Sequence, residues 1–212
     1  MALTFYDCTP APSPRRTRIL LAEKGIEVET VQIDMMKGEQ LTPEYRAISP
    51  TCTIPALKLP SGAVLTENNA ITLYLEDAFP DTPHMLGDTP EERGNVLNWS
   101  LRAEQEGLLA VAEAFRNSTP GMKDRATTGP NNYAQIPELA ARGQARLTAF
   151  MNMMNERLNG REFLAIDQFS YADITAMVTI DFAKWVKVTP TDDHDDLKRW
   201  HAAVCARPSA TA

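Results

Sequence analysis

The sequence CTIPAL at residues 52–57, followed by LTENNAI at residues 65–71, decides the fold of this chain. Proline has no N–H group and is found at the start of a strand rather than in mid-sheet. We therefore expect Pro55 to begin a strand and to leave the Ile54 backbone exposed at a bend, where it can bind another peptide. Because most X-Pro bonds are trans, an ordinary trans proline ahead of a strand is the alternative.

The pair Glu67-Asn68 falls at a predicted junction between a strand and a helix. Free backbone N–H groups and the positive end of the helix can hold a carboxylate there, while Glu67 can meet an ammonium group. Such a pair can recognise the carboxylate and the amine of an amino acid. The alternative is that Asn68 is only an N-cap and Glu67 only a solvated charge.

The pattern around these stretches is that of an α/β domain. Apolar residues at 3–6 and around 28–33 indicate strands, and residues 14–24 indicate a helix between them, ended by Gly25. Residues 56–59 and 63–65 indicate a hairpin with glycine in its turn. A further helix is expected over residues 68–79, with Pro80 after it.

A stretch rich in Pro, Gly and Asp separates this half from a helical half. We expect a first domain at residues 1–82, a linker at 83–89 and a second domain at 90–212. Thr89 with Pro90 and Glu92 predicts the start of a helix that reaches about Asn117. Its apolar residues at helical spacing are Leu97, Leu101, Leu108, Val111 and Phe115.

Two more segments carry clear helix patterns. Residues 137–159 have one apolar face, and Ser170 with Asp173 indicates a capping box at the start of a later helix. The apolar face of the first segment consists of Leu147, Phe150, Met151, Met154 and Leu158. The last helix carries Leu197, Trp200 and Val204.

The composition narrows the class of protein. The chain has 212 residues, a net charge of −7 and three cysteines without CxxC spacing. The charge disfavours nucleic acid and anionic membranes as partners, and the cysteines disfavour a disulfide framework. The start MALTFYD lacks the features of a secretion signal, so we expect a cytoplasmic protein. The dispersed histidines, interpreted as lacking a carboxylate or cysteine at metal-ligand spacing, predict no metal site.

Several motifs resemble the cytosolic glutathione S-transferase family. The run TIPALKL, then SGAVLTENNAITLYLEDAFPD, with RTRILLAEKGI before it, is similar to the glutathione-binding domain of that family. Residues 169–174 resemble the capping motif of its penultimate core helix. KGE at 37–39 and RAE at 102–104 are most similar to an atypical branch grouped with the second yeast-type enzyme and its bacterial relatives. The resemblance implies a thioredoxin-like domain followed by an all-helical domain.

The resemblance also implies roles for individual residues. Ile54 would bind the cysteinyl backbone of glutathione ahead of a cis Pro55, and Glu67 and Asn68 would hold the γ-glutamyl end. Asn68 stands where the family usually has serine, and its backbone N–H and its amide both suit a carboxylate. Lys37 and Gln40 lie in the segment that meets the glycine carboxylate in the family, although either also fits a solvated loop.

The group that activates the glutathione thiol stays open. A thiolate is stabilised by a hydroxyl donor and by a helix N-terminus. By alignment on residues 16–19, the serine of the theta-like classes falls on Pro12 and the cysteine of the omega-like classes on Ala11. Ser13, one residue away, is a candidate activator, an N-cap, or both. The other candidates in this loop are Tyr6, Cys8 and Thr9, of which Tyr6 and Cys8 also fit packing roles.

A water molecule held by the helical domain is the alternative activator. Asn117, Ser118 and Tyr133 are candidates to hold this water or to line the pocket for the second substrate, although Asn117 and Ser118 also fit the end of a helix. Arg102 and Glu104 are expected near the partner subunit of the family's homodimer, or as plain surface charges.

Together these assignments imply a glutathione S-transferase that conjugates the glutathione thiolate to a small hydrophobic electrophile, a detoxification reaction. Glutathione would be the co-substrate, with no metal. Two rival functions remain: glutathione-dependent peroxide or disulfide reduction, and a noncatalytic glutathione-binding or assembly module.

Overall fold

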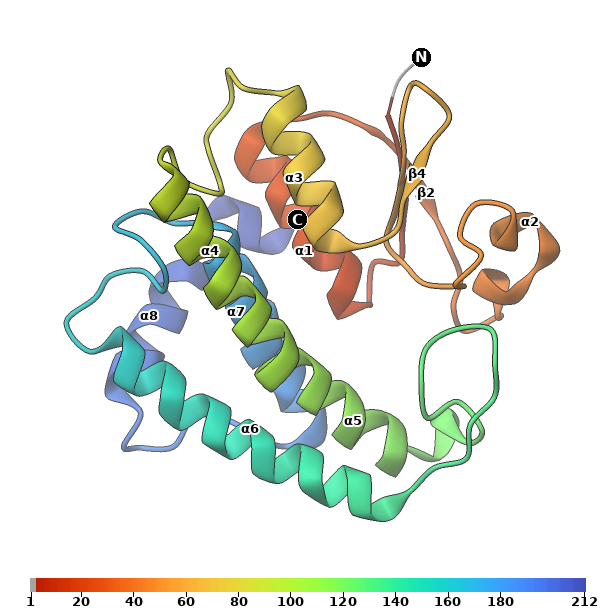
Figure 1. Cartoon of the computed structure of the whole chain (residues 1–212). Coiled ribbons are helices and arrows are strands. Elements are labelled where there is room, and N and C mark those ends of the chain that lie inside the picture. The colour runs from red at the N-terminus through yellow and green to blue at the C-terminus, as the bar shows by residue number, and fades with distance from the viewer. Residues whose placement is uncertain (1–2) are drawn as a thin grey trace. The chain divides into compact units, whose positions relative to one another are not determined.

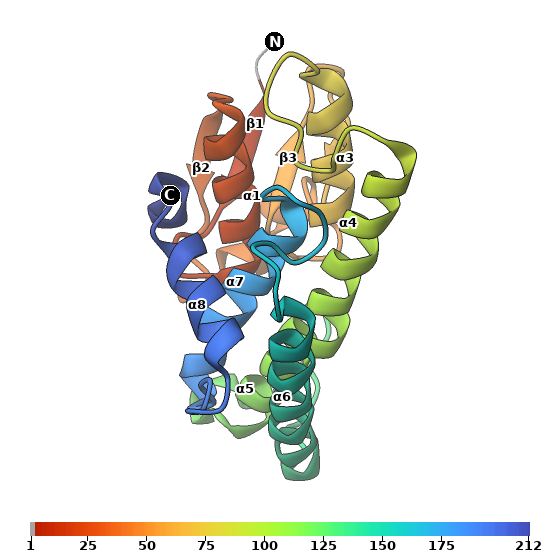
Figure 2. The same cartoon turned by 90° about the vertical axis from the view of Figure 1, so that its left-hand side faces the viewer.

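The computed structural model describes residues 3–212, which form two compact units. The first unit contains the chain up to Pro83 together with residues 128–131 and Ala212. The second contains residues 84–127 and 132–211 (Figure 1, Figure 2). Among the helices of residues 3–212, none combines the length and the apolar character needed to cross a membrane.

A mixed four-stranded sheet with the order β2-β1-β3-β4 forms the centre of the first unit. β1 pairs in parallel with β2 and antiparallel to β3, and β3 pairs antiparallel to β4. The bounds are β1 Thr4–Asp7, β2 Glu29–Gln32, β3 Ala56–Lys58 and β4 Val64–Leu65. The crossover helix between the parallel strands and the following hairpin give the predicted thioredoxin-like arrangement.

Helices cover the sheet of the first unit. α1 (Pro12–Lys24) and α3 (Asn68–Ala78) lie side by side on one face, and the short α2 (Pro43–Arg46) lies on the other (Figure 1). A 3₁₀ turn, η1 (Glu39–Leu41), precedes α2. A buried ion pair joins the two longer helices, with Lys24 Nζ 2.8 Å from Glu76 Oε1. The largest fully buried side chains of this unit are Phe5, Ile19, Leu20, Leu57, Ile71 and Leu75.

The second unit is all-helical, as predicted. α4 and α5 follow each other through one π-helical segment, η2, and α6, α7 and α8 complete the unit (Figure 1). The bounds are α4 Pro90–Arg102, η2 Ala103–Leu108, α5 Leu109–Ser118, α6 Pro137–Leu158, α7 Tyr171–Ala183 and α8 Asp195–Cys205. Short 3₁₀ turns are η3 Pro120–Met122, η4 Lys184–Val186 and η5 Pro208–Thr211.

The start of α7 is fixed by the predicted capping box. The Asp173 carboxylate accepts hydrogen bonds from the backbone N–H and the hydroxyl of Ser170, both at 3.0 Å. It also accepts from the Leu164 N–H and from Trp200 Nε1, both at 2.9 Å. This buried carboxylate therefore ties α7 to the preceding loop and to α8. The predicted apolar face of α6 is also confirmed, since all five of its residues are buried.

The apolar face predicted for α4 is wrong in its first half. Leu101 is 41% exposed, whereas Val96, Ser100 and Ala103 are buried. Small side chains form this contact because α7 comes close, with the Ser100 hydroxyl 3.2 Å from the hydroxyl of Thr175. A pattern of large apolar residues cannot reveal a helix face that is built from small ones.

Candidate functional site

The loop between β1 and α1 brings Ser13 into the first turn of α1. The helix begins at Pro12, with Ala11 as its N-cap, so the interpretation of Ser13 as the N-cap is wrong. Pro12 explains the earlier start, because proline has the φ angle of a first helical residue and the N–H that it lacks has no partner there anyway. Neither Ala11 nor Pro12 offers a side-chain donor, which leaves Ser13 as the first residue of α1 with a hydroxyl.

A buried carboxylate that the sequence analysis did not single out shapes this loop. Asp7 Oδ1 accepts hydrogen bonds from the Cys8 N–H at 2.7 Å and from Arg18 Nη1 at 2.6 Å. Asp7 Oδ2 accepts from Gln32 Nε2 at 2.7 Å, and Arg18 Nη2 donates to the Thr9 carbonyl at 2.9 Å. These bonds hold residues 7–9 against α1 and β2.

The other loop candidates have structural partners. Tyr6 packs edge-on against Tyr45, with 6.1 Å between the ring centroids. The Thr9 hydroxyl donates to Gln32 Oε1 at 3.0 Å. Cys8 is buried, and this burial raises the pKa of its thiol above the usual value, against the weaker effect of backbone hydrogen bonds. Cys8 is therefore disfavoured as a thiolate.

The bend before β3 has the geometry that the resemblance implies. The Ile54–Pro55 peptide bond is cis, and β3 begins only at Ala56, so Ile54 lies outside the strand ladder. The carbonyl of Thr53 accepts hydrogen bonds from the Tyr45 hydroxyl at 2.8 Å and from the Ser49 hydroxyl at 3.1 Å. The chain ahead of Ile54 is thus held in place by α2 and its following turn.

The hairpin brings this bend and the start of α3 to one end of the sheet. β3 and β4 are antiparallel, with Leu57 opposite Leu65, so the start of β3 and the end of β4 lie at the same end of the sheet. Glu67 is the N-cap of α3 and is exposed, and Asn68 is its first helical residue. The first N–H groups of a helix have no carbonyl partner within it, so they are suited to bind a carboxylate.

The side chain of Asn68 is buried and points toward α1. Because the Arg16 guanidinium only donates hydrogen bonds, the amide oxygen of Asn68 belongs on its side, 3.0 Å from Arg16 Nη2. The amide nitrogen then donates to Thr17 Oγ1 at 2.9 Å, and the Ser13 hydroxyl donates to the amide oxygen at 3.0 Å. The amide is therefore occupied by α1, and the backbone N–H is the group of Asn68 that suits a ligand carboxylate.

Lys37 and Gln40 lie in different environments. The Lys37 ammonium is 3.0 Å from Asp34 Oδ2, and its side chain is 78% exposed. The hydrogen bond from Lys37 holds the pKa of Asp34 below its usual value. Gln40 is buried in η1, and within residues 3–212 its side-chain oxygen has no hydrogen-bond partner. Gln40 thus offers a polar group without a protein partner, whereas Lys37 is already paired.

The second unit contains a pocket of about 310 Å³. It is lined by Asn117, Ala126, Thr127, Tyr133, Ala134, Ile136 and Leu139. Asn117 donates to the Glu113 carbonyl and accepts from the Ile136 N–H, both at 2.9 Å. Ser118 is not among the lining residues, and its hydroxyl donates to the Ala114 carbonyl at 2.8 Å. The structure thus brings Asn117 and Tyr133 to one pocket and places Ser118 at the helix end.

Arg102 and Glu104 lie where α4 meets η2. Arg102 is exposed, and its guanidinium carbon lies 5.4 Å from the centroid of the Trp99 ring. Glu104 is half-buried. Arg102 is the last residue of α4, and Glu104 is the second residue of the π-helical segment η2.

One group of metal-ligating side chains was missed. Cys205 follows His201 by four residues, and the structure places both beside Asp181 in the second unit. The four-residue spacing on a helix was the signal in the sequence, and the interpretation that no cysteine stands at metal-ligand spacing is wrong.

Comparison with known proteins agrees with the fold and with the motifs. Residues 11–78 match the glutathione S-transferase N-terminal domain, and residues 119–208 match the glutathione S-transferase C-terminal domain. Glutathione S-transferase 2 of Saccharomyces cerevisiae is 35% identical over 98% of this chain and 87% of its own length. The chain therefore belongs to the glutathione S-transferase family, and it is a glutathione transferase with glutathione as its co-substrate.

Solved structures support the same assignment. A glutathione S-transferase domain-containing protein of Marinobacter aquaeolei has a TM-score of 0.89 and 38% identity, covering 97% of this chain and 98% of its own. Gtt2 of Saccharomyces cerevisiae has a TM-score of 0.88 and 35% identity, covering 97% of each chain. A class Gtt2 enzyme of Vibrio parahaemolyticus has a TM-score of 0.82 and 29% identity, covering 97% of this chain and 94% of its own. The branch predicted from the sequence is confirmed.

Proposed function

We propose that this chain binds glutathione through Ile54, Pro55, Glu67 and Asn68 and conjugates its thiolate to a small hydrophobic electrophile. The observation that carries this proposal is the placement of the Ile54–Pro55 bend and the start of α3 at one end of the β3–β4 hairpin. At the first element, the backbone of a peptide ligand meets that of Ile54, which is half-buried and lies outside the strand ladder. At the second element, the free amino acid end of the ligand meets a helix N-terminus and a carboxylate.

Each part of glutathione has a matching group in this proposal. The cysteinyl backbone pairs with Ile54, the γ-glutamyl carboxylate meets the backbone N–H groups at Asn68, and the ammonium meets Glu67. The glycine end meets Gln40 and Lys37. Support for Gln40 comes from its buried side-chain oxygen, which can accept the N–H of the glycine residue.

The proposed activating group is Ser13. Its hydroxyl lies in the first turn of α1, where the helix dipole favours negative charge. To donate to the thiolate, the hydroxyl turns away from the Asn68 amide oxygen. A water molecule held near Asn117 and Tyr133 is the alternative, and the Ser13 substitution described in the Discussion separates the two.

The electrophile is assigned to the second unit. The pocket that includes Asn117 and Tyr133 is lined mainly by apolar atoms and has a volume suited to a small molecule. Ser118 has a weaker claim, because its hydroxyl is used by the helix end. Conjugation of a hydrophobic electrophile in this way is a detoxification reaction.

The proposal also includes the organisation of the protein. It comprises domains at 1–82 and 90–212 with a linker at 83–89, a cytoplasmic location, and a homodimer with Arg102 and Glu104 near the partner subunit. Light scattering coupled to gel filtration tests the last point, and a mass equal to one chain would contradict it.

Retention on immobilised glutathione tests the binding site. The wild-type chain should be retained and eluted by free glutathione. Glu67→Ala should lose retention because the ammonium of glutathione loses its partner. Glu27→Ala is the matched control, since Glu27 is an equally exposed carboxylate of the same unit. Retention of Glu67→Ala at the wild-type level would show that the assigned site is wrong.

A further inference from the structure

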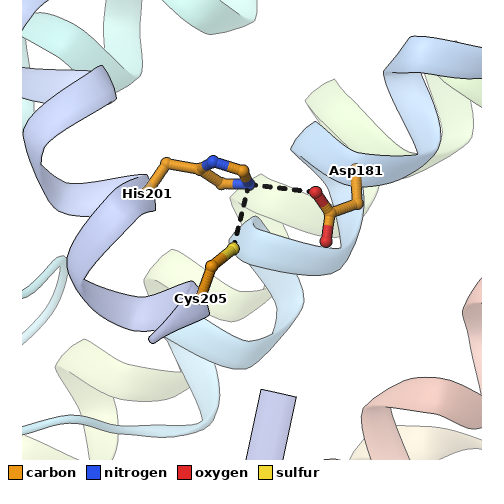
Figure 3. A group of neighbouring side chains, drawn as sticks. All are labelled: Asp181, His201 and Cys205. Atoms are coloured by element: carbon orange, nitrogen blue, oxygen red, sulfur yellow. Dashed lines mark hydrogen bonds and ion pairs between the residues drawn. The ribbon is translucent and has the colours of Figure 1, made fainter. Parts of the chain in front are cut away.

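A cluster of three side chains in the second unit gathers metal-ligating atoms (Figure 3). Asp181 comes from α7, and His201 and Cys205 come from consecutive turns of α8. His201 Nε2 lies 3.1 Å from Asp181 Oδ1 and 3.4 Å from Cys205 Sγ. The three ligand atoms all lie within 4.8 Å of one another. None of these residues belongs to the proposed glutathione site, which lies in the first unit.

Two of the three spacings in this cluster, nitrogen to oxygen and nitrogen to sulfur, are close to those of a tetrahedral zinc site. With Zn–N and Zn–O of about 2.1 Å and Zn–S of about 2.3 Å, tetrahedral angles require N···O of about 3.4 Å and N···S of about 3.6 Å. The observed 3.1 Å and 3.4 Å are shorter than these by only about 0.2–0.3 Å. A small outward movement of half-buried side chains accommodates the ion.

The direction of the histidine ring supports a shared ligand. The same nitrogen, Nε2, faces both the carboxylate and the sulfur (Figure 3). One N–H cannot point well at two acceptors, whereas the lone pair of the neutral ring can point at an ion placed between them. Sulfur, imidazole nitrogen and carboxylate oxygen together suit zinc and its close analogue cobalt.

The site is accessible, and one competing cation lies beside it. The side chains of His201 and Asp181 are 18% and 20% exposed, so an ion and a water molecule can reach them. The ammonium of Lys184 lies 2.7 Å from Asp181 Oδ1 and neutralises part of the carboxylate charge. Its side chain is 52% exposed and can turn into solvent when a metal ion binds.

We propose that Asp181, His201 and Cys205 form a binding site for one zinc-type divalent cation. The fourth position of the tetrahedron is open to water or to an external ligand, as it is in sites with three protein ligands. Binding releases the thiol proton of Cys205 to solvent and displaces the proton that His201 Nε2 donates to the Asp181 carboxylate, because the thiolate and the ring-nitrogen lone pair are the forms that coordinate. Lys184 lowers the affinity of the site through its positive charge.

Cobalt titration of the full chain tests the proposal. The protein is stripped with a chelator, kept reduced with a phosphine and freed of glutathione, which itself binds metal. We expect one Co²⁺ per chain and a thiolate-to-cobalt charge-transfer band that Zn²⁺ abolishes. Cys205→Ser should lose the band, and His201→Asn and Asp181→Asn should each weaken binding by about 10-fold or more. No band in the wild-type chain, or a band that persists in Cys205→Ser, would overturn the proposal.

Two further variants guard against loss of folding as the explanation. Lys184→Gln keeps all three ligands and removes the competing charge, so it should tighten Co²⁺ binding by about 2- to 10-fold. Unchanged or weaker binding by Lys184→Gln would count against the assigned site. His84→Asn is the matched control, because His84 pairs with the Asp88 carboxylate at an exposed position. It should leave the titration unchanged, and a loss of binding there would place the metal elsewhere.

Discussion

The hydroxyl oxygen of Ser13 lies 3.0 Å from the side-chain amide of Asn68. The group that we propose for thiol activation is therefore hydrogen-bonded to the residue that we propose for γ-glutamyl binding. A change at either position removes one hydrogen bond from the other residue, and Arg16 Nη2 remains as a partner of both. If both assignments hold, this contact couples the binding of glutathione to the activation of its thiol.

We predict that Ser13→Ala raises the pKa of bound glutathione and lowers kcat/KM by about 10- to 100-fold, the effect of one hydrogen bond to a charged group. The pH dependence of thiolate absorbance in the binary complex measures the pKa. Ser13→Thr, which keeps the hydroxyl, is the control. A wild-type thiol pKa and full turnover in Ser13→Ala would instead favour the water-mediated route.

Asn68→Ala keeps the backbone N–H but removes the hydrogen bonds that fix the start of α3 to α1, so it should weaken glutathione binding and also alter the thiol pKa. We combine Asn68→Ala with Ser13→Ala in a double-mutant cycle. When the changes in kcat/KM are expressed as free energies, we expect the double variant to differ from the sum of the single variants by about 0.5–3 kcal/mol, as for residues in direct contact. Steady-state kinetics of the four proteins measures this coupling. If the two effects are strictly additive, the hydrogen bond between Ser13 and Asn68 does not contribute to catalysis.

The crossing of α5 and α6 depends on a glycine. A Cβ at Gly143 would lie 2.7 Å from both the Ala110 carbonyl oxygen and the Ala114 nitrogen, which are backbone atoms that cannot turn away. We predict that Gly143→Ala lowers the free energy of unfolding by about 1–3 kcal/mol. Gly94→Ala, with open space around it, should raise it by about 0.5–1 kcal/mol. Urea unfolding measures both, and changes of the same sign would contradict this view.

The buried pair of Lys24 and Glu76 should show the cost of an isolated charge. Among residues 3–212, Glu76→Ala leaves the Lys24 ammonium with the Pro83 carbonyl, 2.9 Å away, and should cost about 3–5 kcal/mol. Replacing both residues, Lys24→Met with Glu76→Leu, removes both charges and should recover most of that loss. Urea unfolding measures both variants. If the double variant is less stable than Glu76→Ala, the attraction within the ion pair exceeds the free-energy cost of removing its two charges from water.

Acid should remove the contribution of Glu113. Hydrogen bonding from Arg142 lowers the pKa of Glu113 against the effect of its burial, and Arg146 adds to the lowering. A lowered pKa in the folded state stabilises the protein above the unfolded value of 4.5, and this contribution is lost as the pH falls through the folded value. Glu113→Gln should therefore cost about 1 kcal/mol at pH 7 and progressively less below about pH 4.5. A difference independent of pH would contradict this assignment.

Features that depend on neighbouring residues could be predicted from the sequence. The capping box of Ser170 and Asp173 and the buried face of α6 follow from local spacing, and both are as expected. The cis bond before Pro55 could be expected only from the family resemblance, since most X-Pro bonds are trans and the residues alone favour a trans bond.

Features that depend on contacts between distant segments could not be predicted. The face toward α7 is built from Ser100 of α4 and Ala103 at the start of η2, and small residues carry no hydrophobic signal. The amide of Asn68 turns toward α1 because Arg16 and Thr17 lie there. The carboxylate of Asp181 reaches His201 only because α7 and α8 meet.

The π-helical segment η2 between α4 and α5 has a consequence for the history of this chain. One residue added to a continuous α-helix would rotate everything after it by about 100°, but a π turn contains about one residue more than an α turn and so absorbs the extra residue. Deleting one residue within Ala103–Leu108 would therefore restore an α-helical turn and leave the same face of α5 toward α6. Where two relatives differ in it, we expect their sequences to differ in length by one residue at this point.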